Sequence, residues 1–124
     1  MRKKLLLFSL LTFLTSACSF YTINSEDTTA DFFPPKNSPS DVVVLDSVDQ
    51  PHVVIANITV NTERNQRIND VIEKMKREAA ILGGDAITNI QTDATGTWRQ
   101  LPAQHIIKNG YIRASFTASV IIFK

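Results

Sequence analysis

The residues that most often carry chemistry are few in this sequence and widely separated. His52 and His105 stand alone, and Cys18 is the sole cysteine. A metal site normally needs three or four convergent ligands, and no cluster of that kind occurs along the chain. We therefore expect neither a metal nor a cofactor. His52 follows Pro51 directly, which favours a place in a turn or at a strand edge.

No sequence pattern of a catalytic site is present either. The chain has no GxSxG, no HExxH and no glycine-rich phosphate loop after a strand. Asp85 and Asp93 would share one face of a regular strand, but roughly 27 Å would separate their carboxylates, which is too far for joint acid–base work. Gly83 and Gly84 end a helix, whereas phosphates bind at helix starts. The sequence therefore predicts a protein that is not an enzyme.

Partner binding is the remaining kind of chemistry. Trp98 is the only tryptophan and stands next to Arg99. Tryptophan and arginine are over-represented among the residues that dominate protein interfaces, so these two are candidates for a partner contact. The alternative is that Trp98 caps one end of the hydrophobic core. The edges of an open sheet are a second place where another copy or an extended peptide could pair.

The start of the chain has the pattern of a secretion signal. Basic residues 2–4 precede the apolar run 5–13, and the small residues 15–17 lead up to Cys18. Residues 5–17 would extend about 20 Å as a helix, which is short for a hydrocarbon core of about 30 Å. This length favours a signal that is removed over a permanent transmembrane anchor.

Ser16 and Ala17 directly before Cys18 resemble the processing site of bacterial lipoproteins, although Thr15 stands where leucine is most usual. The resemblance implies cleavage before Cys18 and acylation of that cysteine. Two or three acyl chains hold a protein stably on a membrane. Ser19 implies sorting to the outer membrane in bacteria that use the residue after the cysteine as a signal. The alternative is ordinary cleavage near Ala17 with no lipid.

Composition and charge are those of one small globular domain with a tail. Of the 13 basic residues three lie in residues 2–4, so residues 18–124 hold ten basic and twelve acidic side chains. A nucleic-acid-binding protein would show a clustered basic excess, which this chain lacks. We expect a signal peptide at 1–17, an acylated cysteine with a flexible tether at 18–40, and one domain at 41–124. Within the tether, residues 32–35 (FFPP) could dock on the domain, touch a membrane or partner, or remain free.

The hydrophobic pattern of the domain predicts ββαββ order. Strands are expected at 42–46, 52–61, 85–92 and 112–122, the last with a continuous apolar face. In 52–61 the alternation would turn Val54 inward together with Ala56, Ile58 and Val60. The fold class is α+β: a small four-stranded, mostly antiparallel sheet with one amphipathic helix packed on one face.

The helix has its apolar residues at helical spacing. These residues are Ile68, Val71, Ile72, Met75, Ala79 and Leu82. Thr62 or Asn65 could cap its start, and Gly83-Gly84 ends it. A longer polar connection follows the third strand, in which Ile106-Ile107 could begin a hairpin that closes near Asn109-Gly110.

Residues 79–87 (AAILGGDAI) resemble the helix-to-strand junction of small envelope lipoproteins of the RcsF-like type, and of the YbjQ-like domain. The resemblance implies a lipoprotein that faces the periplasm and acts by contact with another envelope protein or with itself, in envelope structure or stress sensing. The disulfide-forming cysteines of the RcsF stress sensor are absent here. The YbjQ-like alternative implies an oligomeric module that binds a ligand or a metal.

Overall fold

The computed structural model describes residues 21–62, 66–102 and 111–124. In chain order the elements are β1 (Tyr21–Asp27), the 3-10 helix η1 (Pro39–Asp41), β2 (Val43–Leu45), β3 (His52–Thr62), β4 (Gln66–Arg67), α2 (Ile68–Ile81), β5 (Ala86–Thr92), β6 (Arg99–Gln100), β7 (Tyr111–Ile112) and β8 (Ser115–Phe123). Among these residues no helix is long and apolar enough to cross a membrane.

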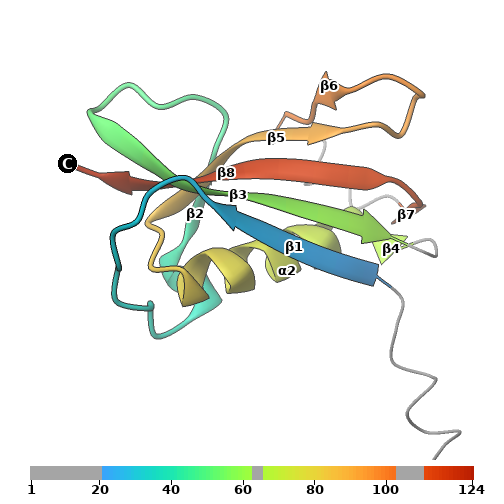
Figure 1. Cartoon of the computed structure of the whole chain (residues 1–124). Helices are drawn as coiled ribbons and strands as arrows, with labels where there is room; N and C mark the ends of the chain where they lie inside the picture. Colours follow the sequence, from blue (N-terminus) through green and yellow to red (C-terminus); the bar gives the residue numbers. More distant parts are fainter. Residues whose placement is uncertain (1–20, 63–65, 103–110) are drawn as a thin grey trace, which may run out of the picture.

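The described strands form an open sheet in the order β1-β3-β8-β5-β2, and β6 also pairs with β5 (Figure 1). All pairs in this sheet are antiparallel except β2 with β5. β4 and β7 form a separate two-stranded ribbon. The predicted α+β class is confirmed, but the described sheet has six strands where four were expected, because β1 and β6 join it.

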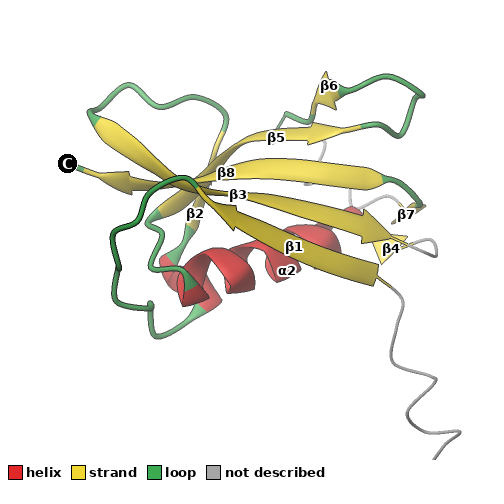
Figure 2. Ribbon diagram, viewed as in Figure 1, coloured by secondary structure: helices red, strands yellow, loops and turns green. Residues whose placement is uncertain are grey.

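Helix α2 lies along one face of the sheet, and the core fills the space between them (Figure 2). Met75 of α2, Ile58 of β3 and Phe116 of β8 are fully buried in this core. Complete burial of a side chain of this size stabilises the fold by roughly 1.5–3 kcal/mol. The helical spacing read from the sequence is confirmed by the buried residues of the helix, which are Val71, Ile72, Met75, Ala79 and Ala80.

The sequence prediction is confirmed at the C-terminal end of α2, but Thr62 does not have the predicted role at its start. At the C-terminal end, Gly83 has a φ of +85° and its N–H donates to the Ala80 carbonyl, while the Gly84 N–H donates to the Ala79 carbonyl. These two bonds make a Schellman motif, as the Gly-Gly pair predicted. At the start, Thr62 does not cap the helix. Its hydroxyl bonds the backbone of Ala114 across the sheet, and Asn65 lies outside the described residues.

A bulge in β3 overturns the predicted alternation in its first half. The partner of Val54 is Ile121 and that of Ala56 is Val120, so Ile55 is an extra residue in the ladder. An extra residue reverses which side chains face inward on one side of the bulge. Ile55 is therefore buried in the core with Ala56, whereas Val54 is 38% exposed and does not point inward as expected.

A second bulge lies in β5 between Thr88 and Gln91 and includes Asn89, whose φ is +53°. Asparagine is one of the few residues other than glycine that accept this conformation readily. The bulge explains how Ile87 and Ile90, which strict alternation would place on opposite faces, both belong to the main core.

The last predicted strand is divided in two. Its core-facing residues Phe116, Ala118 and Val120 are buried as expected. The long strand, however, begins only at Ser115, and Ile112 pairs with Gln66 in the β4–β7 ribbon. The hairpin expected near Ile106-Ile107 and Asn109-Gly110 lies outside the described residues.

The flexible tether predicted for residues 18–40 is wrong for the part that the structure describes. Tyr21 to Asp27 pair with β3 over the whole strand, from Tyr21 opposite Thr62 to Asp27 opposite Ala56. Tyr21 and Ile23 pack against the core. The folded domain therefore begins no later than Tyr21, twenty residues before the boundary expected at Asp41.

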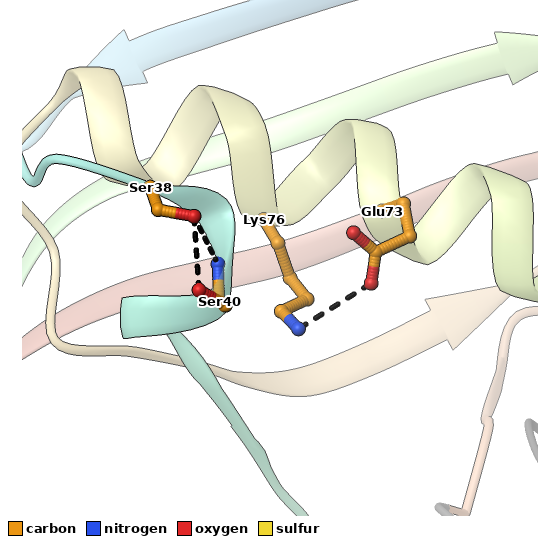
Figure 3. A network of polar contacts seen from close by, with 4 residues as sticks. All are labelled: Ser38, Ser40, Glu73 and Lys76. Carbon is orange, nitrogen blue, oxygen red and sulfur yellow. Dashed lines mark hydrogen bonds and ion pairs between the residues drawn. The ribbon is translucent and has the colours of Figure 1, made fainter.

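The rest of the supposed tether is also attached to the domain. Ser38 begins η1, where its hydroxyl accepts a hydrogen bond from the Ser40 N–H at 3.2 Å. η1 packs beside α2, near the ion pair of Lys76 with Glu73 (Figure 3). Residues 28–36, which we call the strap, connect β1 to this turn.

Candidate partner-binding site

Of the predicted site residues, the structure describes Trp98 and Arg99, which are neighbours in the chain. Trp98 is 50% exposed in the turn before β6, and Arg99 is exposed in β6 itself. Their predicted role as a partner contact stays a prediction. Cys18 and His105 lie outside the described residues.

His52 is the first residue of β3, and its Nδ1 lies 2.9 Å from the Gln50 carbonyl oxygen. It therefore occupies the turn-to-strand position that Pro51 indicated. Within residues 21–62, 66–102 and 111–124, no group of three or more His, Cys, Asp or Glu side chains could hold a metal ion.

Asp85 and Asp93 stand at opposite ends of β5, and each carboxylate binds backbone. Asp93 Oδ1 accepts from the Ser115 N–H at 2.8 Å. Asp85 Oδ2 accepts from the Phe123 N–H at 2.8 Å, and its Oδ1 lies 2.7 Å from Lys36 Nζ. The two aspartates fix neighbouring strands, and Asp85 in addition holds the end of the strap.

The surroundings of Asp85 favour its ionised form. Partial burial by itself raises the pKa of this carboxyl, but the hydrogen bonds from Lys36 and from the Phe123 amide, with the positive charge of Lys36, outweigh it. The net result is a pKa below the ordinary value, so Asp85 stays charged and paired at neutral pH.

The strap is fixed at both of its ends. Thr28 donates from its N–H to the Ile55 carbonyl at 3.0 Å and from its hydroxyl to the Val54 carbonyl at 2.7 Å. Lys36 donates from its N–H to the Ala80 carbonyl at 2.8 Å, close to its ion pair with Asp85. The strap thus joins the end of β1, the C-terminal turn of α2 and the start of β5.

Gly83 lets the middle of the strap lie directly on the end of the helix. A Cβ at this position would come within 2.7 Å of Phe33 Cβ and within 2.8 Å of the Phe33 and Pro34 carbonyl oxygens. Real Cβ atoms do not approach other atoms so closely, so only glycine fits here. Phe33 is partly buried against the core as a result.

The neighbouring Phe32 is turned outward and is 83% exposed. Beside it lies a hollow of about 110 Å³, well below the roughly 300–1,000 Å³ of small-molecule pockets but sufficient for part of one side chain. Ile81, which lines it, is 57% exposed. We call this surface the strap hollow; its lining residues are Asp27, Asp31, Phe32, Phe33, Ile55, Ile81 and Leu82.

The strap hollow could not be located from the sequence. The FFPP run at 32–35 signalled that something apolar lies in this segment, and left docking, contact and freedom as alternatives. The two aromatic residues differ in the structure: Phe33 docks on the core, and Phe32 remains exposed. Ile81 gave no separate signal, since it is one apolar residue within a helix.

A second hollow of about 450 Å³ lies between β2 and the turn that precedes β3. Asp49 is the one titratable residue in its lining, which is otherwise apolar or neutral. The lining residues are Val43, Leu45, Ser47, Val48, Asp49, Gln50 and Phe123. Its size falls within the range of small-molecule sites, and three of its lining residues, Ser47, Asp49 and Gln50, are polar.

The fold defines a class of small α+β domains in which one helix covers an open, mostly antiparallel sheet. A solved member of this class is similar to the chain: the Francisella virulence factor FvfA, whose crystal structure in the orthorhombic form aligns with a TM-score of 0.51. The alignment covers 81% of this chain and 96% of the Francisella protein, at 12% sequence identity. At that identity the similarity establishes the fold alone. No protein-family model and no curated protein sequence matches the chain.

Proposed function

We propose that this protein is a bacterial envelope lipoprotein, held on the membrane by acyl chains on Cys18, that acts without catalysis by binding another protein at the strap hollow. The pattern of residues 2–18 supports the anchor, and the similarity to RcsF-like lipoproteins at residues 79–87 agrees with it. The outer membrane is the proposed location because serine follows Cys18.

The binding role rests on one observation: Phe32 of the strap and Ile81 of α2 are both exposed and both line the strap hollow. Scattered exposed apolar residues are ordinary, but two that flank a depression offer an anchor point for a partner side chain. Because the strap is held at both ends, little conformational entropy would be lost when a partner binds.

The chemistry of the hollow indicates the kind of partner. Its lining is mostly apolar, and it also includes two acidic residues, Asp27 and Asp31. A segment with one aliphatic or aromatic side chain next to a lysine or arginine would match both features. The distance from the anchor suits a periplasmic partner, because Asp27 lies at the opposite end of β1 from Tyr21, roughly 20 Å along the strand.

A photo-crosslinking amino acid at position 32 of the protein in cells tests this role. We expect it to capture one discrete protein, since a side chain there points to the partner. The same probe at Asn57, which is exposed on β3, is the matched control and should capture none. Ile81→Ser should reduce capture from position 32 by about tenfold if the hollow contributes roughly 1.4 kcal/mol. Equal capture from both positions, or capture unaffected by Ile81→Ser, would rule out the strap hollow.

The second hollow favours one alternative function, a YbjQ-like module that binds a small ligand. An apolar compound of suitable size would occupy the space between Val43, Leu45 and Phe123. Binding would raise the melting temperature in proportion to the logarithm of ligand concentration. If a library of apolar compounds produces such a rise, and Leu45→Gln abolishes it, this alternative replaces the first.

A further inference from the structure

One end of the sheet gathers several chain segments near the start of β1. Tyr21 lies opposite Thr62, the last residue of β3, and Thr92, the last residue of β5, lies opposite Phe116 near the start of β8. The turn from β5 to β6 leaves from this end, and the β4–β7 ribbon lies there too (Figure 1). We call it the Tyr21 end.

The position of Cys18 restricts how far this end can lie from a membrane. Two residues, Ser19 and Phe20, stand between Cys18 and Tyr21, so the three steps from one Cα to the next span at most about 11 Å when fully extended. Tyr21 itself is fixed to β3 and packs on the core. If Cys18 carries the lipid, as the proposed function requires, the Tyr21 end is held within about one headgroup layer of the bilayer.

The side chains at this end have the chemistry of a membrane surface contact. Trp98 precedes Arg99, the register partner of Thr92, so this half-exposed indole belongs to the Tyr21 end. Arg99 is exposed, as is Arg113, which stands two residues before β8 begins. Tryptophan prefers the level of the lipid headgroups, and arginine binds anionic headgroups.

The charges around these residues agree with that orientation. Lys74 is a further basic group at this end and lies over the Tyr21 ring at 4.6 Å from its centroid. Among the described residues, carboxylates at this end include Asp93, which is engaged with the Ser115 amide, and Asp70 in the first turn of α2. Asp46 lies beside β6, where its carbonyl accepts from the Gln100 side chain.

The opposite end of the sheet also carries carboxylates among the described residues. Asp27 and Asp31 line the strap hollow, and Asp49 lies in the turn before β3. An anionic bilayer would attract the Tyr21 end and repel this one.

We infer that the Tyr21 end docks on the surface of the bilayer that holds the Cys18 lipid, with Trp98 at headgroup level and Arg99 and Arg113 against anionic headgroups. This inference rests on the proposed function. It adds that the domain has one fixed orientation, with the strap hollow directed away from the membrane.

Trp98 is the only tryptophan, so its fluorescence tests the inference directly. The acylated full-length mature protein is reconstituted into vesicles of phosphatidylethanolamine and phosphatidylglycerol, with or without brominated phospholipid as a short-range quencher. The matched control is the double variant W98F/F32W, in which the sole tryptophan is moved to an exposed position at the other end. We expect quenching to be roughly threefold or more stronger at position 98 than at position 32, because only the first lies at headgroup level.

The contribution of the two arginines is tested separately. In the same vesicles R99E/R113E should weaken the quenching of Trp98, and added salt should do so in the unsubstituted protein. Equal quenching at positions 98 and 32 in protein that floats with the vesicles would overturn the docking while leaving the lipid anchor intact. Failure of the protein to float with vesicles would overturn the anchor, and the docking with it.

Discussion

Two residues fix the geometry of the strap from opposite sides. Gly83 supplies a surface without a side chain, on which Phe33 and Pro34 lie, and Asp85 supplies the carboxylate that binds Lys36. Both belong to the short junction from α2 to β5, so the turn that ends the helix also positions the candidate binding surface. Neither residue needs a catalytic or metal-binding role to account for its place.

Replacement of Gly83 by alanine should destabilise the protein more than the same change at Gly96. Both glycines have positive φ, at +85° and +90°, and alanine in that region costs about 1–2 kcal/mol. Nothing lies within 4 Å of a Cβ built at Gly96, whereas at Gly83 the strap backbone does. We expect Gly83→Ala to lower the free energy of unfolding by about 1–3 kcal/mol more than Gly96→Ala in urea titrations. Equal losses would show that the strap does not lie on Gly83.

Asp85 should make part of the stability dependent on pH. Its pKa in the folded protein is lowered by Lys36 and the Phe123 amide despite partial burial. The contribution is therefore complete above the unfolded pKa of about 3.9 and is lost as the pH falls through the lower folded value. The stability difference between the unsubstituted protein and Asp85→Asn should be smaller at pH 3 than at pH 6.

The matched control for this experiment is Asp49→Asn, which removes an exposed carboxylate from the turn before β3. It should change stability little at either pH. A difference for Asp85→Asn that stays the same from pH 6 to pH 3 would contradict the ion pair with Lys36.

At the scale of elements, the largest difference from the sequence prediction is β1, which is a paired strand where a flexible tether was expected. Because the strand is paired with β3 throughout, its bonded backbone amides should exchange with solvent far more slowly than those of the exposed turn at 94–97. Hydrogen exchange measured by mass spectrometry checks this. Ile23→Ser should reduce the protection, since Ile23 packs on the core, whereas Asn24→Ser at an exposed position should not. If the amides of residues 21–27 exchange as fast as those of the turn, β1 is not stably paired with β3 and the predicted flexible tether is correct.

The elements predicted correctly from the sequence are those with a strong period. α2, the second half of β3 and most of β8 bury regular sets of apolar residues, so the pattern of each reflects its packing. β1 has only Tyr21 and Ile23 as sizeable apolar residues among polar ones, because it is an edge strand. β6 is two residues long and gives no pattern.

The bulges and the strap are set by tertiary structure. The reversal at Ile55 depends on its pairing with β8, more than 60 residues further along the chain. The strap hollow combines residues from β1, the strap, β3 and α2, so no local stretch of sequence describes it. The contact role of Trp98 and Arg99 stays a prediction, and their place in the fold follows only from the register of β5 with β6.

At the scale of the whole molecule, the domain has two ends with different chemistry. The Tyr21 end follows Cys18 closely and carries Trp98 with basic residues, whereas the other end carries the strap hollow with Asp27 and Asp31. If the Tyr21 end is anchored to the membrane, the strap hollow at the other end would hold a partner at a fixed distance from the bilayer. The lipid on Cys18 is the central claim, because the orientation and the proposed partner site both depend on it.

The most direct test is the intact mass of the protein purified from the membrane fraction, together with fractionation of Cys18→Ser. We predict a chain that begins at Cys18 and carries a diacylglycerol with an added acyl group, and loss of membrane association in the variant. A membrane-bound chain that begins elsewhere without lipid, or a Cys18→Ser variant that stays with membranes after a salt wash, would contradict the account.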